Sequence, residues 1–265
     1  MKKIKFLVLI PALAILAACS KPEVKQGVLK YEMKSYSQAV GDTSGLSNNY
    51  ATAVLKYPEI KEATSQYIMD NLNNFVRANV LTALFKEGEY KTPEFFMENF
   101  LKEYSKFNED KPSDMPSIWT IERIVDITYE SPKVVSFSFY ETSFLGGAHP
   151  NTNIFYTPFN LLTGVQLYKN DVFIEGYEAK LTAIAEKKFR EEKELTPDAN
   201  LEEADFNFKD NKFALNSNFG FTKEGIIFYF NSYEIAPYAL GPTAIELKYG
   251  EIKELLKKEF LPEGL

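Results

Sequence analysis

Cysteine, histidine and tryptophan are almost missing from this chain of 265 residues, which contains one of each. A single cysteine cannot form an intramolecular disulfide, so the hydrophobic core has to provide the stability. A zinc site takes three or four ligands, mostly histidine and cysteine, and too few donors are present for one. The sequence also lacks the P-loop, Gly-x-Gly-x-x-Gly, His-Glu-x-x-His and Gly-x-Ser-x-Gly motifs. We therefore expect no metal, no cofactor and no recognisable catalytic motif.

Basic residues are also fewer than acidic ones. The chain has 30 Lys and Arg against 37 Asp and Glu, a formal net charge of −7. Proteins that bind nucleic acid need a basic face, so we exclude nucleic acid as a partner. An acidic balance suits a basic partner or a cationic ligand, and it serves plain solubility equally well.

One apolar stretch lies at the N-terminus and ends at the only cysteine. Three lysines in residues 1–5 precede the apolar residues 6–16, and small residues then lead to Cys19, an order typical of a secretory signal peptide. The stretch is shorter than the ~20 residues that span a bilayer. The motif LAAC resembles the lipobox of bacterial lipoproteins. We expect residues 1–18 to be a lipoprotein signal peptide, Cys19 to carry the lipid and residues 19–27 to form a tether.

The periodicity of hydrophobic residues predicts an N-terminal α+β domain over residues 28–112. Loose alternation predicts strands at 28–37 and 49–56. A helical period predicts a long helix from Pro58 to Lys86, since proline is common at a first helical position. Threonine and proline at 92–93 predict the start of a second helix. Its buried stripe is expected to be Phe96, Phe100, Tyr104 and Phe107.

A charged, proline-containing segment at 108–117 predicts the domain boundary, with a C-terminal α+β domain over residues 113–265. Strands and helices come in blocks, which favours an α+β fold made of two parts. The N-terminal part has strands plus two helices, and the C-terminal part has an antiparallel sheet with packed helices. The expected C-terminal strands are 118–129, 133–140, 153–159, 212–221, 225–230 and 243–249, and the expected helices are 177–193 and 251–259.

The only histidine, His149, lies in the segment GGAHPN at residues 146–151. Two adjacent glycines permit positive φ, and Pro150 keeps His149 out of the helical region. Such a rigid loop either displays the histidine and the following Asn151 for acid–base chemistry or recognition, or is a structural turn whose histidine bonds its neighbours.

A loop rich in tyrosine and proline lies between two expected strands, at residues 229–242. It contains Tyr233, Pro237 and Tyr238. Tyrosine on a rigid loop adds contact area at low entropic cost, which favours recognition. The alternative is a crossover packed on the core. The acidic segments 202–205 and 210–211 lack the spacing of a calcium loop and are typical of solvated surface.

The segments 146–151 (GGAHPN), 162–164 (LTG) and 233–241 (YEIAPYALG) together resemble the extracytoplasmic domain of unknown function in lysozyme-sensing anti-sigma factors. The resemblance covers about residues 118–257. The segment from Tyr57 resembles the companion domain that also occurs beside polysaccharide deacetylases. In the anti-sigma factors this domain binds lysozyme and controls the cleavage of a membrane-spanning receptor. The resemblance therefore implies a binding module of the cell envelope. From this sequence we expect no transmembrane helix, no sigma-binding segment and no deacetylase catalytic domain.

The sequence therefore predicts a lipid-anchored, non-enzymatic binding protein of the cell envelope, periplasmic or surface-exposed. It would recognise a protein such as lysozyme or a cell-wall glycan, with the ligand contacts His149, Asn151, Tyr233, Pro237 and Tyr238. One alternative is an envelope glycan hydrolase or deacetylase-associated enzyme, since paired carboxylates leave no sequence motif. Another is a structural partner of other envelope proteins.

Overall fold

A computed structural model describes residues 27–44, 48–111, 115–262 and 264. The predicted signal peptide, Cys19 and nearly all of the tether lie outside the described residues. Within the described residues, no helix is both long and apolar enough to cross a membrane.

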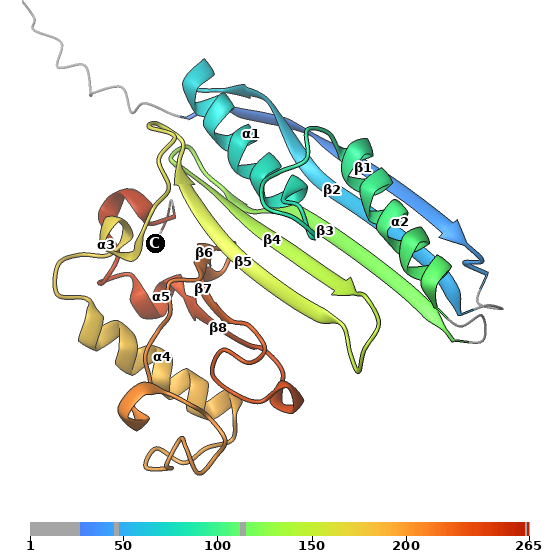
Figure 1. Cartoon of the computed structure of the whole chain (residues 1–265). Coiled ribbons are helices and arrows are strands. Elements are labelled where there is room, and N and C mark those ends of the chain that lie inside the picture. The colour runs from blue at the N-terminus through green and yellow to red at the C-terminus, as the bar shows by residue number, and fades with distance from the viewer. Residues whose placement is uncertain (1–26, 45–47, 112–114, 263, 265) are drawn as a thin grey trace, which may run out of the picture.

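A five-stranded sheet forms the larger half of the molecule (Figure 1). Its strands stand in chain order and are β1 (Leu29–Gly41), β2 (Asn49–Ala63), β3 (Ser117–Glu130), β4 (Val134–Phe144) and β5 (Asn151–Asn160). All neighbours are antiparallel except β2 and β3. A parallel pair needs a long crossover, and this one contains two helices that cover one face of the sheet.

Each of the two crossover helices begins directly after a capping residue. In α1 (Gln66–Leu81), the side chain of Ser65 accepts a hydrogen bond from the Ile68 N–H at 3.3 Å. In α2 (Pro93–Asp110), Thr92 accepts from the Phe95 N–H at 3.2 Å. The predicted start of the second helix is thus confirmed. Its aromatic stripe is buried at Phe96, Phe100 and Tyr104, but Phe107 is 41% exposed and packs on Trp119.

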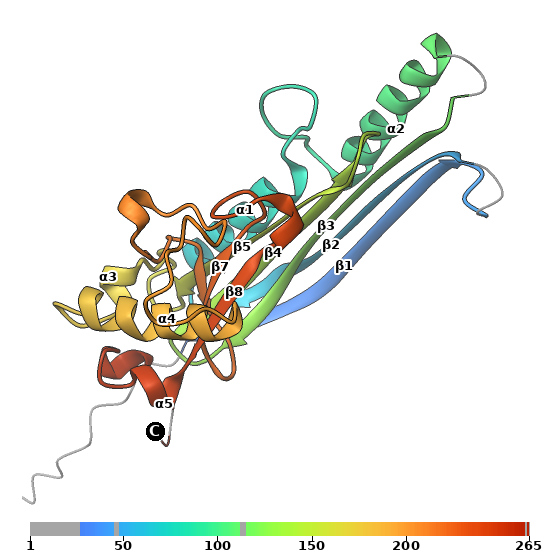
Figure 2. The same ribbon diagram turned by 90° about the horizontal axis from the view of Figure 1, so that it is seen from below.

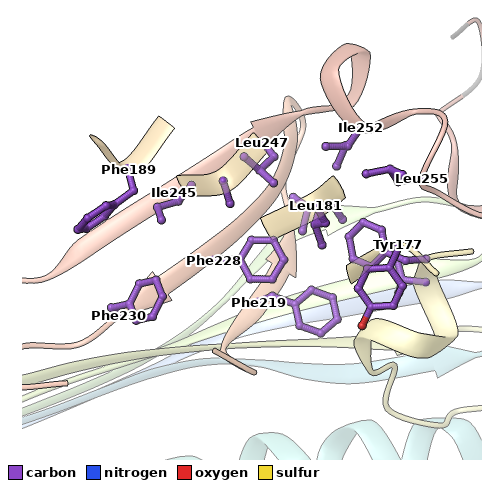
Figure 3. Close-up of a cluster of buried hydrophobic side chains, with 14 of the residues drawn as sticks. Tyr177, Leu181, Phe189, Phe219, Phe228, Phe230, Ile245, Leu247, Ile252 and Leu255 are labelled. Carbon is purple, nitrogen blue, oxygen red and sulfur yellow. The ribbon is translucent and has the colours of Figure 1, made fainter. Parts of the chain in front are cut away.

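A smaller antiparallel sheet forms the C-terminal half. It contains β6 (Phe219–Phe221), β7 (Gly225–Phe230) and β8 (Thr243–Lys248), in that order. The helices α3 (Lys169–Val172), α4 (Glu178–Glu192) and α5 (Tyr249–Ile252) accompany it. Side chains from α4, β7, β8 and α5 pack against one another in a core of their own, drawn in Figure 3. The predicted α+β class is confirmed.

The smaller sheet lies against the face of the larger sheet that the crossover helices leave uncovered, toward one end (Figure 2). The Phe221 N–H donates to Ser136 Oγ at 3.0 Å, and Thr128 Oγ1 donates to the Phe221 carbonyl at 2.9 Å. A Cβ at Gly220 would stand 2.7 Å from Ser136 Oγ and 2.9 Å from Tyr156 Cβ. The close approach of the two sheets therefore demands glycine at this position.

The predicted helix from Pro58 to Lys86 is wrong in its first part, because β2 continues through Pro58 to Ala63. Strand β3 pairs with β2 only as far as Lys56. The Ile60 N–H, two residues after the proline, donates to the Asn73 side chain at 2.9 Å and not to β1. Alternate residues of a strand point their N–H groups the same way. The missing N–H of Pro58 thus faces a side where no strand needs it.

Three further predictions differ from the structure. The strand predicted at 212–221 is reduced to Phe219–Phe221, and the closing helix to α5 and a 3₁₀ turn at Lys258–Phe260. The boundary predicted at residue 112 falls inside a continuous sheet, since β2 pairs with β3 across it. Apart from Val134, the buried residues of one core end at Leu161 and those of the other begin at Leu167.

Candidate functional site

The GGAHPN segment forms the loop between β4 and β5, whose strands pair as far as Ser143 and Asn151. Gly146 and Gly147 have φ of +86° and +122°, in the region that favours glycine. A Cβ on either would meet nothing within 4 Å. Glycine is therefore favoured here because of the positive φ and not because of steric crowding. The turn places His149 at the surface, with its Nδ1 3.0 Å from the Pro150 carbonyl oxygen.

The tyrosine–proline segment connects β7 to β8 and is strongly bent. Tyr233 has φ of +68°, an uncommon value for a residue other than glycine. Pro237 precedes a single 3₁₀ turn, η2 (Tyr238–Leu240), and its carbonyl accepts from the Leu240 N–H at 3.0 Å. Gly241 then ends the turn with φ of +68°. This path brings the side chains of both tyrosines next to His149.

The two loops meet in a cluster of three rings, His149, Tyr233 and Tyr238, which we call the ring cluster. The His149 and Tyr238 rings stack with centroids 3.7 Å apart and planes 14° apart. The hydroxyl of Tyr233 lies 3.2 Å from His149 Nε2, and the Tyr233 and Tyr238 rings are 5.6 Å apart. Tyr233 remains 64% exposed and Tyr238 38%. The cluster therefore presents aromatic surface to solvent while its rings hold one another.

Two asparagines hold the tyrosine–proline loop against β5. The Asn231 side chain accepts from the Ile154 N–H at 2.7 Å and donates to the Ile154 carbonyl at 3.1 Å. Asn218 likewise accepts from the Tyr156 N–H at 2.7 Å and donates to the Ile154 carbonyl at 2.8 Å. These amides satisfy the backbone groups at the open edge of β5, as a further strand would. They are the contacts that bring Tyr233 and Tyr238 to His149.

Replacing Asn231 with alanine is expected to lower the free energy of unfolding by about 1–3 kcal/mol, because both backbone groups of Ile154 lose a partner. Asn231 is only 8% exposed, so water replaces the lost bonds poorly. Urea denaturation measures the change. Asn231→Asp is the matched comparison, since it keeps an acceptor for the Ile154 N–H but replaces the donor with a charged oxygen that repels the Ile154 carbonyl. An alanine variant as stable as the parent would contradict this role.

The other two predicted ligand contacts lie beside the ring cluster. Asn151 is exposed at the start of β5, and in the described part of the chain it has no hydrogen bond to the three rings. Pro237 borders an open cavity of about 440 Å³ that also reaches Tyr233. The remaining residues around this cavity are Glu202, Asp205, Phe206, Asn207, Glu234, Ile235 and Ala236.

The chemistry of the ring cluster favours contact over catalysis. The described partners of the His149 ring are a backbone carbonyl and a tyrosine hydroxyl, not a carboxylate that would orient it as a general base. The rings of Tyr156 and Tyr229 pack on each other 6.1 Å apart, and burial raises the pKa of both phenols, so both stay neutral. Among the described residues, no three His, Cys, Asp or Glu side chains are placed to share a metal ion.

Sequence reasoning located His149, Tyr233 and Tyr238 but could not place them together. It missed Asn218 and Asn231 entirely. Each stands next to β6 or β7, where asparagine is typical of a turn. Both form hydrogen bonds with Ile154, which is 64 residues from Asn218 and 77 residues from Asn231 in the chain.

Comparisons with known proteins match two separate segments of the chain, one on each side of residues 153–169. Residues 45–152 match the family described as Deacetylase PdaC, and residues 170–250 match the family described as a protein of unknown function, DUF3298. His149 falls in the first match, and both tyrosines fall in the second. The ring cluster is therefore a contact between the two matched segments.

One curated relative is the peptidoglycan-N-acetylmuramic acid deacetylase PdaC of Bacillus subtilis strain 168. It is 28% identical over 141 residues, which are 52% of this chain and 29% of the deacetylase. The chain thus spans less than a third of that enzyme's length. Two solved structures share the fold over 88% of this chain. They are DUF3298 family proteins from Bacteroides fragilis NCTC 9343 (TM-score 0.63, 20% identity, 96% of that chain) and Pseudomonas aeruginosa PAO1 (0.62, 14%, 97%).

Proposed function

We propose that this protein is a lipid-anchored, non-enzymatic binding protein of the cell envelope, and that the ring cluster is its recognition surface. The ligand is a protein such as lysozyme or a cell-wall glycan. The observation that carries the proposal is the stack of His149 on Tyr238 with Tyr233 beside it, exposed yet held in place from both halves of the molecule. Similarity to part of a peptidoglycan deacetylase supports a place in the envelope.

Stacked rings suit recognition for a physical reason. Tyrosine offers a flat apolar face and a polar hydroxyl, so it packs on a sugar ring or an aliphatic side chain and hydrogen-bonds at its edge. Rings already fixed by their neighbours lose little conformational entropy when a ligand binds. The net charge of −7 would additionally speed the approach of a basic protein.

Gly27, the first described residue, lies away from the ring cluster, which agrees with an anchored binder. The Gly27 N–H donates to the Pro132 carbonyl at 2.6 Å, in the turn between β3 and β4. The ring cluster lies at the opposite end of β4, which has 11 residues. At about 3.4 Å per residue this strand spans about 37 Å. A lipid on Cys19 would therefore leave the ring cluster unobstructed.

Calorimetry of the chain with lysozyme and, separately, with soluble peptidoglycan fragments tests the proposal. We expect heat of binding with one of the two, because exposed and preorganised rings can pack on a ligand surface of complementary shape. The absence of heat with both would remove its main support. Incubation with intact peptidoglycan tests the non-enzymatic part. Release of fragments by the parent chain, lost in His149→Ala, would show an enzyme instead.

A further inference from the structure

Strand β1 is a long open edge of the five-stranded sheet. It has 13 residues and pairs with β2 along its whole length. Within the described residues no strand pairs with its other side, and Figure 2 shows it at the outer margin of the sheet. Every second residue of such a strand points its N–H and C=O groups outward, ready to pair with another chain. Proline, a common protection of edges, is absent from β1, and the pairing irregularity lies near its start, between Lys30 and Tyr31.

The sequence of β1 is complementary to itself in one register. Two copies of a strand that pair antiparallel about a twofold axis have one residue opposite its own copy. With Met33 at the axis, Glu32 stands opposite Lys34 of the second copy, and Lys34 opposite its Glu32. Opposite charges in directly facing positions stabilise a strand pair. An axis at Glu32 or at Lys34 would instead place like charges opposite each other.

The two faces of β1 support the same register. Met33 is 50% exposed and Tyr31 40%, and both lie on the same face because they are two residues apart. Pairing at Met33 would bring these apolar side chains of the two copies together and cover them. On the other face Glu32 and Lys34 already form ion pairs with their neighbours on β2, Lys61 at 3.6 Å and Glu59 at 3.2 Å. Glu59 on β2 stands directly opposite Glu32, and Lys34 lies 3.0 Å from Glu32 on β1 itself. Lys34 of the second copy would add a further cation beside these two carboxylates.

We propose that β1 pairs with β1 of a second copy of this chain, antiparallel and with the twofold axis at Met33. Residues 29–37 of each copy then overlap. The two five-stranded sheets become one continuous sheet of ten strands, and the open edge of each is covered. The ring cluster, at the end of the sheet formed by β4 and β5, stays free in both copies. The proposal is independent of what the ring cluster binds.

Sedimentation equilibrium of the chain carrying Cys19→Ser, and therefore no lipid, tests this pairing. The parent is expected to reach twice the mass of one chain as its concentration rises. Met33→Lys and Met33→Glu are each expected to stay monomeric, since each places two like charges at the axis. An equimolar mixture of the two variants is expected to recover the double mass, because the lysine introduced in one copy then faces the glutamate introduced in the other.

The matched control is Tyr67→Lys on α1, which introduces the same charge at a side chain that is 62% exposed. It is expected to dimerise as the parent does, and circular dichroism shows that each variant keeps its fold. A parent that stays monomeric at every concentration would overturn the proposal. So would a Met33→Lys variant that still dimerises, or a mixture of the two charge variants that fails to associate.

Discussion

Replacing Arg123 with methionine is expected to lower the free energy of unfolding by about 3–5 kcal/mol, the usual cost of breaking a buried ion pair. Arg123 is 3% exposed in the middle of β3. Its Nε lies 2.6 Å from a carboxylate oxygen of Glu141 on β4. Its Nη1 donates to the carbonyls of Val80 and Thr82 at 2.9 and 2.6 Å. One side chain thus joins the sheet to the end of α1.

The effect is expected to be large because the substitution would leave the Glu141 carboxylate without a partner. Burial lowers the pKa of Arg123, and the charge of Glu141 opposes that effect. The ordinary pKa of arginine is so high that the side chain nevertheless remains charged. Without it, the Glu141 carboxylate loses its ion-pair partner at a site where its side chain is only 17% exposed, and the two carbonyls at the end of α1 lose their donor.

Urea denaturation of three variants separates the ion pair from a general loss of packing. Arg123→Met combined with Glu141→Leu is expected to be more stable than Arg123→Met alone, because no unpaired charge remains. Lys187→Met removes an exposed ion pair with Glu191 and is expected to change stability very little. An Arg123→Met variant as stable as Lys187→Met would contradict the structural role given to Arg123.

Replacing Tyr238 with alanine is expected to weaken ligand binding by about 30-fold or more, the effect of losing a central aromatic contact. The substitution removes the ring that stacks on His149 at 3.7 Å and frees the imidazole to move. It also removes the neighbour of the Tyr233 ring. The binding surface therefore loses both contact area and preorganisation.

Calorimetry with whichever ligand gives heat with the parent chain measures this loss. Tyr238→Phe is expected to bind nearly as well, since it keeps the stacked ring. Tyr67→Ala removes another exposed tyrosine, on α1, and is expected to leave the affinity unchanged. Equal affinities for Tyr238→Ala and Tyr67→Ala would show that the ring cluster does not bind the ligand.

The local signals in this sequence are reliable where one residue decides the structure. Thr92 and Pro93 marked the start of α2, and the limits of β7 at Gly225 and Phe230 agree with the prediction. Pro58 was misread because proline suits the first turn of a helix as well as a strand position whose N–H needs no partner. The second reading depends on where β3 stops pairing with β2, which is a tertiary feature.

The candidate site was predictable only in pieces for the same reason. Glycines at 146 and 147 and the proline after His149 identified a rigid loop, and the tyrosines identified another. That the loops meet depends on how Asn231 and Asn218 bond to the edge of β5. An asparagine that pairs with a distant strand has the same local signature as one in an ordinary turn.

A ligand that contacts the stacked His149 and Tyr238 must change the surroundings of the imidazole. Because the chain has a single histidine, ¹³C placed only at the histidine Cε1 atom gives one ring signal in an NMR spectrum. We expect this signal to move when the calorimetrically identified ligand is added, and Tyr238→Ala to shift it without ligand because the stacked ring is lost. A ligand that binds fully while the His149 signal stays in place would contradict this contact.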